Sequence, residues 1–243
     1  MYKTKLIILR TVKSGETSLV VTAFTELFGV QTYIVNGVRS AKKAGLKAAL
    51  YQPASLLDAE IYHNDKNTMH RIREANRAIV FRNVLTDVVT NSVAVFLMEL
   101  LYKLLKQPEN NSELFYFCED ILIQLDDASP NICANLPLFF VLQLSHFFGF
   151  RMDDNFSERN LFLDLQEGNF VSTQPTHPHF ISGENAMLSA EILRIRIPAE
   201  LEQIKMNHFR RRELLAKYME YYSLHIHDFG QMKTLSVMQE VLG

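Results

Sequence analysis

The sequence predicts an α+β fold in which an amino-terminal OB-fold β-barrel precedes an all-helical domain with a small β-hairpin insertion. Three observations support this prediction. Short runs of β-branched and aromatic residues, separated by turn signals, occupy residues 5–63. After about residue 81 the apolar residues recur at helical spacing instead. The charge changes at the same place, because residues 1–82 hold 13 basic and 6 acidic side chains, whereas residues 83–243 hold 12 and 21.

This charge asymmetry also predicts the domain organisation. The chain has 243 residues and a net charge of only −2, because the positive charge of a basic module nearly cancels the negative charge of an acidic one. The length suits two small domains, which we expect at residues 1–80 and 81–243. Segregated charge of this kind indicates that a polyanion binds at one end of the chain and a different partner at the other.

Four strands are expected in the first domain, at residues 5–12, 17–24, 30–38 and 55–63. Turn signals separate them at Gly15, at Gly29 and at Asn36-Gly37. Several short strands in fewer than about 80 residues favour a closed barrel, which leaves no exposed sheet edge.

The third strand is expected to place an aromatic ring on the outside of the barrel. Its alternation assigns one set of side chains to the interior, namely Val30, Thr32, Ile34 and Val38. The other set would face outward, namely Gln31, Tyr33, Val35 and Arg39. We therefore expect Tyr33 to be available to stack on a nucleic-acid base.

A cluster of cations follows this strand. Arg39, Lys42, Lys43 and Lys47 lie among small residues in a stretch that we expect to be a flexible loop rather than a helix. Further cations follow at Lys66, Arg71, Arg73, Arg77 and Arg82. The pattern is typical of a groove that follows a phosphate backbone. The alternative is a solvated surface loop, but the acidic remainder of the chain favours the nucleic-acid interpretation.

The cysteines and the apolar segments exclude several classes of protein. Cys118 and Cys133 form no CxxC pair, so neither a metal site nor a disulfide framework is indicated, and a reducing cytoplasm fits. No signal-peptide pattern opens the chain. The apolar stretch Val84–Leu105 contains Asp87 and Glu99, which are costly in hydrocarbon, so we expect a buried core helix and no membrane partner.

The second domain is expected to be helical around one β insertion. Helices are predicted at residues 83–106 and 112–127, from Pro137 to Gly149 and at 182–194. Another is predicted to start near Pro198, with residues 208–226 as its continuation or its successor, and a final one lies near 233–242. Residues 151–182 predict a hairpin and a stiff loop. His177 and His179 in that loop suggest a metal site, but no cysteine and no helical histidine spacing accompany them, so no metal is expected.

Arg210, Arg211 and Arg212 stand out because their surroundings are acidic. They would suit an acidic peptide or phosphates. A solvated helix edge is the favoured alternative, because Glu213 and Lys217 form an ordinary i,i+4 pair on the same helix.

Motifs for catalysis are absent from the sequence. It contains no P-loop, no GxGxxG after a strand, no GxSxG and no HExxH. Paired acids such as Asp126-Asp127 and Asp153-Asp154 lie at helix ends and in loops, where capping or solvated roles are usual. We therefore expect no enzyme activity, no catalytic residue and no cofactor.

Several segments resemble the bacterial DNA repair protein family RecO. The amino-terminal likeness lies in Leu9, Gly15-Glu16, Phe24-Thr25, Gly29 and Gly37-Val38-Arg39, and in the segment LYQPASLLDAEIY. The ending YYSLHIHDFGQMKTLSVMQEVL is similar to the tail of RecO proteins from Bacteroidetes-like bacteria. The likeness spans the whole chain in order.

The resemblance implies an OB fold followed by a helical domain, in a cytoplasmic, nucleoid-associated protein. It implies binding of single- and double-stranded DNA, annealing of complementary strands, and joint action with RecR to load RecA onto DNA coated by the single-strand-binding protein. The acidic tail of that coating protein would dock on the helical part. Many RecO proteins carry a four-cysteine zinc module there, but residues 160–182 contain no cysteine, so we expect a zinc-free hairpin.

Two sets of residues are therefore expected to bind partners. The DNA-binding set is Arg10, Lys13, Tyr33, Arg39, Lys42, Lys43, Lys47, Arg71 and Arg73. The set for the acidic tail of the single-strand-binding protein is Lys205, Arg210, Arg211 and Arg212. One alternative function is a non-catalytic adaptor whose barrel binds a protein instead of DNA. A second is a hydrolase, which would need a catalytic constellation that the sequence does not supply.

Overall fold

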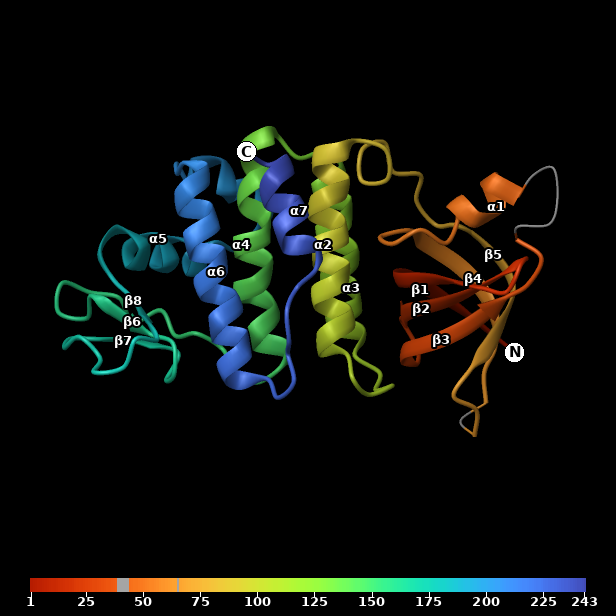
Figure 1. Ribbon diagram of the computed structural model, residues 1–243, viewed down its shortest axis with the longest axis horizontal. Helices are drawn as coiled ribbons and strands as arrows, with labels where there is room; N and C mark the ends of the chain where they lie inside the picture. Colours follow the sequence, from red (N-terminus) through yellow and green to blue (C-terminus); the bar gives the residue numbers. More distant parts are fainter. Residues whose placement is uncertain (39–43, 65) are drawn as a thin grey trace. The chain divides into compact units, whose positions relative to one another are not determined.

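The computed structural model describes residues 1–38, 44–64 and 66–243, which form two compact units (Figure 1). The first unit, Met1–Asp127, contains a closed barrel and two long helices. The second unit, Ala128–Gly243, contains the remaining helices and a small sheet. The predicted division after residue 80 follows the last barrel strand, but the compact unit continues to Asp127 because two helices pack with the barrel.

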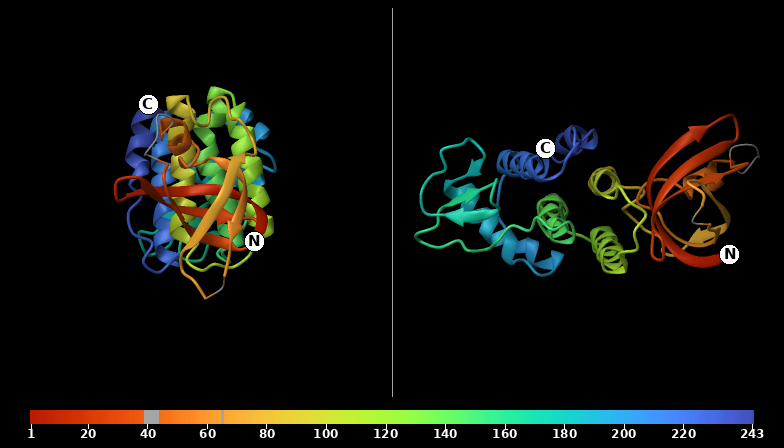
Figure 2. Two further views of the ribbon diagram at one scale, coloured as in Figure 1. Left: turned by 90° about the vertical axis from the view of Figure 1, so that its right-hand side faces the viewer. Right: turned by 90° about the horizontal axis from the view of Figure 1, so that it is seen from below.

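Five strands close the barrel: β1 (Tyr2–Ser14), β2 (Ser18–Thr25), β3 (Gly29–Val35), β4 (Leu56–Tyr62) and β5 (His70–Arg77). Their order around the barrel is β1-β2-β3-β5-β4, with β3 and β5 parallel and the other neighbours antiparallel (Figure 2). A five-stranded barrel of this topology is an OB fold, so the predicted fold class is confirmed.

The predicted orientation of the third strand is wrong. Tyr33 is 0% exposed and lies in the barrel core, and Gln31 and Val35 are also buried. Both faces of this strand carry apolar residues, so the alternation alone could not show which face points into the barrel. The largest side chain occupies the interior. Tyr33 therefore cannot stack on a base, and burial raises the pKa of its hydroxyl well above the usual range.

Two further expectations about the barrel fail. β5 was not predicted, because its sequence HRIREANR is polar; pairing with β4 from Leu57 to Tyr62 holds it in place. The expected loop between the third and fourth strands contains helix α1 (Ala44–Ala49), whose Ala48 packs against the barrel core. A six-residue helix has little stability on its own, so its packing against the barrel core explains why it forms.

The turn between β2 and β3 depends on Gly29. Its φ is +64°, and a methyl group at this position would lie 2.1 Å from the carbonyl oxygen of Glu109. Only glycine combines this backbone conformation with so close an approach. The turn therefore packs closely against the loop that joins the two long helices of the first unit.

Those helices are α2 (Val88–Leu104) and α3 (Ser112–Asp126). The ring of Phe24 on β2 lies 5.5 Å from that of Phe115 on α3. Lys5 Nζ on β1 lies 2.7 Å from Oε1 of the buried Glu119, and this hydrogen bond raises the pKa of Lys5. An aromatic contact and an ion pair are thus among the interactions that join the barrel to α3 within the unit. No helix in the described ranges is long and apolar enough to cross a membrane.

The second unit contains α4 (Pro130–Phe147), α5 (Gly183–Arg194), the 3-10 helix η1 (Pro198–Gln203), α6 (His208–His225) and α7 (Thr234–Val241). Helix α4 begins at Pro130 and not at Pro137 as predicted, because the Ser129 hydroxyl accepts the Ile132 N–H and caps the earlier start. Pro137 is buried inside the helix.

The predicted hairpin is present in the second unit. Strands β6 (Phe162–Asp164) and β7 (Asn169–Val171) pair antiparallel, and β8 (Phe180–Ile181) adds a third strand in the order β7-β6-β8. Leu163 and Phe170 are buried beneath this small sheet.

Candidate nucleic-acid interface

The nine residues predicted to bind DNA differ in their surroundings. Arg39, Lys42 and Lys43 lie outside the described residues. Tyr33 is buried, as stated above. The five remaining cations, Arg10, Lys13, Lys47, Arg71 and Arg73, all lie on the barrel or on α1 and are exposed.

Two of these five cations are already engaged. Arg10 Nη1 donates a hydrogen bond of 3.0 Å to the hydroxyl of Tyr102 on α2, and its guanidinium lies over the same ring. Arg73 Nη1 lies 2.9 Å from a carboxylate oxygen of Glu60 on β4. A phosphate at either position would have to compete with an existing partner.

Lys13, Lys47 and Arg71 form no ion pair with any residue that the structure describes. Lys47 and Arg71 line one groove of about 500 Å³. Its walls are the end of β3, helix α1 and strand β5, and its other lining residues are Ile34, Val35, Asn36, Val38, Leu50, Tyr51, Ile72, Arg73, Glu74, Ala75 and Asn76. We call it the β3–β5 groove.

The barrel topology opens this groove. β3 and β5 pair at only two positions, Tyr33 with His70 and Ile34 with Arg71, after which the strands separate. Helix α1 lies beyond that point, and the buried Tyr51 that follows it accepts a hydrogen bond from the Thr11 hydroxyl through its carbonyl. The groove is therefore a consequence of the short parallel contact.

Lys13 lies at the same end of the barrel as the β3–β5 groove. It pairs with Leu19 on β2, and Leu19 pairs with Val35 on β3, which lines the groove. Adjacent strands lie about 4.8 Å apart, so two strand spacings place the Lys13 backbone about 10 Å from Val35. A lysine side chain spans much of that distance.

Another part of the barrel surface is acidic. A second groove, of about 460 Å³, lies on β1, β4 and β5 and is lined by Lys3, Thr4, Lys5, Glu26, Asp58, Ala59, Glu60, Glu74 and Asn76. Its four carboxylates outnumber its two lysines, and both lysines are paired with carboxylates. The basic module is therefore polarised, and phosphate would be repelled from this groove.

One exposed aromatic residue was missed by the sequence analysis. Tyr62 at the end of β4 is 52% exposed and pairs in register with Arg71 on β5. Its place in the alternation of the fourth strand, after the buried Ile61, was the signal that could have identified it.

The four residues predicted to receive an acidic tail separate in the second unit. Arg210 forms an ion pair of 2.7 Å with Glu184, and Lys205 donates to the carbonyl of Glu202. Arg211 donates to Asn135 on α4, and burial lowers the pKa of its guanidinium. Arg212 donates to the carbonyl of Gln239 on α7. Successive helical residues point about 100° apart, which explains these different partners.

Arg211 and Arg212 nevertheless line one narrow groove of about 20 Å³ between α4, α6 and α7, which we call the α4–α6–α7 groove. Apolar and basic side chains meet there. The other lining residues are Ala134, Pro137, Leu138, His208, Leu215, Met238, Gln239, Leu242 and Gly243.

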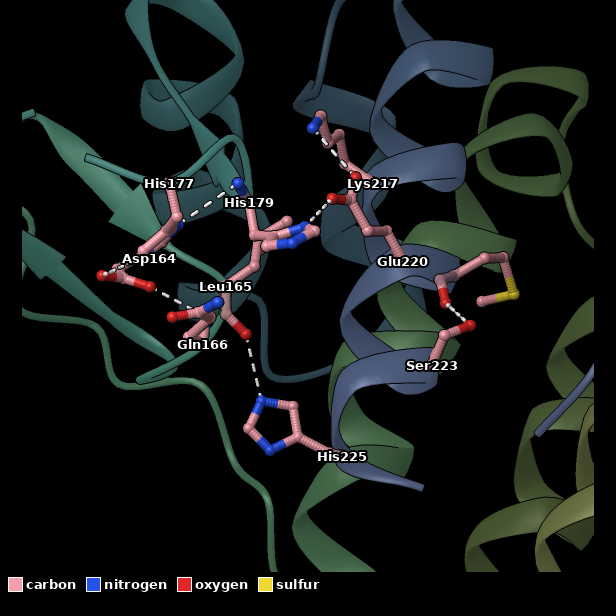
Figure 3. A network of polar contacts seen from close by, with 10 residues as sticks. Asp164, Leu165, Gln166, His177, His179, Lys217, Glu220, Ser223 and His225 are labelled. Carbon is pink, nitrogen blue, oxygen red and sulfur yellow. Dashed lines mark hydrogen bonds and ion pairs between the residues drawn. The ribbon is translucent and has the colours of Figure 1, made fainter. Parts of the chain in front are cut away.

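Polar contacts hold the small sheet in place (Figure 3). His177 Nε2 lies 3.2 Å from Asp164 on β6, and His179 Nδ1 lies 2.6 Å from Glu220 on α6. Burial raises the pKa of Glu220, but hydrogen bonds from His179 and Lys217 outweigh it, so the pKa is lowered. In the described parts of the chain, no three His, Cys, Asp or Glu side chains are grouped to hold a metal ion.

Comparison with known proteins covers both units. Residues 1–79 match the family described as "Recombination protein O N terminal", and residues 85–234 match "Recombination protein O C terminal". The chain is 31% identical to the DNA repair protein RecO of Christiangramia forsetii, with 99% of this chain and 98% of that protein covered. It is 28% identical to the DNA repair protein RecO of Azobacteroides pseudotrichonymphae, with 99% of both chains covered.

These matches confirm the resemblance inferred from the sequence, including the likeness to relatives from Bacteroidetes. They agree with the OB-type barrel and the helices that follow it. The chain therefore belongs to the RecO family of DNA repair proteins.

Proposed function

We propose that this protein is a DNA-binding recombination mediator that acts in DNA repair without catalysing a reaction. It binds single- and double-stranded DNA through the β3–β5 groove and anneals complementary strands. Together with RecR it helps to load RecA onto DNA coated by the single-strand-binding protein, in the cytoplasm at the nucleoid. The observation that supports this proposal most is that Lys13, Lys47 and Arg71, which form no ion pair with the described residues, lie at one end of an OB-type barrel.

The proposed mechanism is electrostatic. Lysine and arginine side chains replace the counterions of the phosphate backbone, and release of those ions favours binding at low salt. Annealing requires that the repulsion between two strands be screened while the base edges remain free to pair. Cations that contact only phosphates meet both requirements, and no proton transfer is needed.

We also propose that the α4–α6–α7 groove receives the acidic, apolar-tipped tail of the single-strand-binding protein. Its apolar residues Leu138, Leu215 and Met238 are buried, so helix α7 would move aside to admit the tip, and Arg211 and Arg212 suit the acidic part. Lys205 and Arg210, which have partners elsewhere, contribute less.

A peptide titration tests the tail site. Arg212→Ala is expected to weaken binding of a fluorescent acidic peptide with an apolar end by about tenfold, because one charge-assisted contact contributes about 1.5 kcal/mol. Arg196→Ala, which removes an exposed cation outside the α4–α6–α7 groove, serves as the matched control and should leave the affinity unchanged. Equal affinities for the wild-type protein and Arg212→Ala would remove this groove from the proposal.

An anisotropy titration of the purified protein with labelled single-stranded DNA tests the main proposal. Saturable binding that weakens steeply with salt is expected. The alternative is an adaptor whose barrel binds a protein while a partner holds the DNA. Absence of binding at low salt would favour the adaptor over the mediator.

A further inference from the structure

A continuous row of outward-facing residues crosses the barrel beside the β3–β5 groove. Register pairs join Val12 on β1 to Val20 on β2, Val20 to Ile34 on β3, Ile34 to Arg71 on β5, and Arg71 to Tyr62 on β4. Side chains at paired positions lie on the same face of a sheet, about 5 Å apart. The row therefore runs over all five strands.

The two ends of this row expose apolar surface. Val12 is 45% exposed and Tyr62 is 52% exposed, while Val20 and Ile34 are half-buried. The Tyr62 ring forms no hydrogen bond and no ring contact with any residue in the described ranges. By contrast, the exposed Tyr2 packs edge-on against Phe28. Tyr62 is thus a large flat side chain with a free face.

The charges beside the row favour an anionic ligand. Arg71 stands between Ile34 and Tyr62 in the row, and it also lines the β3–β5 groove. Glu60, an acid on the outer face of β4, lies 2.9 Å from Arg73 and 3.7 Å from Lys3. Its charge is therefore compensated, and it does not oppose an anion at Arg71.

We propose that Tyr62 and Ile34 are a stacking platform for the bases of single-stranded DNA, with Arg71 between them on the phosphate backbone. The proposal rests on the function proposed above and adds a preference for single strands. In a duplex the base faces are covered by their neighbours, so only an unpaired strand can offer a base to Tyr62. Stacking on an aromatic side chain tolerates any sequence, because every base has a flat face.

The occupant that we infer is a nucleic-acid strand and not a peptide. A peptide bound at a sheet surface needs a free strand edge for its backbone hydrogen bonds, and at the row itself β3 and β5 are paired, Ile34 with Arg71. A ring with a free face, beside a guanidinium that forms no ion pair with the described residues, matches the alternation of base and phosphate instead.

Tryptophan fluorescence gives a direct test, because the chain contains no tryptophan. In Tyr62→Trp the single indole should be quenched by an oligothymidylate and not by an abasic oligonucleotide of the same length. Val80→Trp, at a position that is 71% exposed and outside the row, is the matched control and should respond equally to both. Equal quenching of the Tyr62→Trp indole by the two oligonucleotides would overturn the stacking platform.

The DNA affinities of two further variants distinguish a failure of the stacking platform from a failure of DNA binding itself. Tyr62→Ala should weaken binding of single-stranded DNA about tenfold and leave duplex affinity unchanged, whereas Tyr62→Phe should bind like the wild type because stacking needs only the ring. If Tyr62→Ala binds both DNA forms like the wild type, the platform is wrong while DNA binding stands. If the wild type binds neither form, both proposals are wrong.

Discussion

Reversing two charges in the β3–β5 groove is expected to weaken DNA binding about 100-fold at low salt. The double variant Lys47→Glu/Arg71→Glu replaces two attractive contacts with phosphate by two repulsive ones, in a groove with few other cations. Both side chains are exposed, so the fold should be retained. Anisotropy titrations with single- and double-stranded oligonucleotides of unrelated sequence would measure the loss, which should be similar for every sequence.

A matched control separates local contact from total charge. Arg159→Glu/Arg196→Glu changes the net charge by the same amount at two exposed positions of the second unit. Its DNA affinity should fall by much less than that of the groove variant. Equal losses for the two double variants would mean that the chain's overall charge controls binding and that the groove has no special part in it.

Loss of the Asp126 carboxylate is expected to destabilise the first unit by about 3 kcal/mol. Its two oxygens accept the backbone N–H groups of Arg82, Asn83 and Val84, each at 2.8 Å, and the residue is buried at the end of α3. Asp126→Ala leaves these donors unsatisfied, and hydrogen bonds to a charged group contribute about 1.5–3 kcal/mol each before relaxation. Urea unfolding followed by circular dichroism measures the change.

The neighbouring acid provides the control for this variant. Asp127 is exposed and its side chain makes no hydrogen bond with the described residues, so Asp127→Ala should change the free energy of unfolding by less than about 0.5 kcal/mol. Amide hydrogen exchange at residues 82–84 should accelerate in Asp126→Ala alone. Similar unfolding curves for the two variants would contradict the role assigned to Asp126.

The sequence predicted those parts of the fold in which local signals agree. Runs of β-branched residues and glycine turns located four barrel strands, and apolar spacing located the long helices, although α4 begins earlier than predicted. β5 was missed because its stability comes from pairing with β4 and not from its own residues. The facing of β3 was inverted because apolar residues occupy both of its faces, and only tertiary packing places Tyr33 inside.

The candidate site was predictable in composition but not in detail. The charge asymmetry correctly singled out the barrel as the basic region, yet folding brings Glu60 to Arg73 and Tyr102 to Arg10 from distant parts of the chain. No sequence pattern reveals these pairings. Lys13 on β1 and Arg71 on β5 lie at the same end of the barrel only because of the strand order. The sequence likewise could not show that helix α6 directs Arg210, Arg211 and Arg212 to three different partners.

The salt dependence of DNA binding tests most directly the central claim, that unpaired cations at the end of the barrel hold the phosphate backbone. The logarithm of the association constant for single-stranded DNA should be plotted against the logarithm of salt concentration for the wild type and for Lys13→Gln/Lys47→Gln/Arg71→Gln. Each lost phosphate contact lowers the steepness by about 0.7, so the plot for the variant should be shallower by about 2. Two parallel lines would contradict the claim.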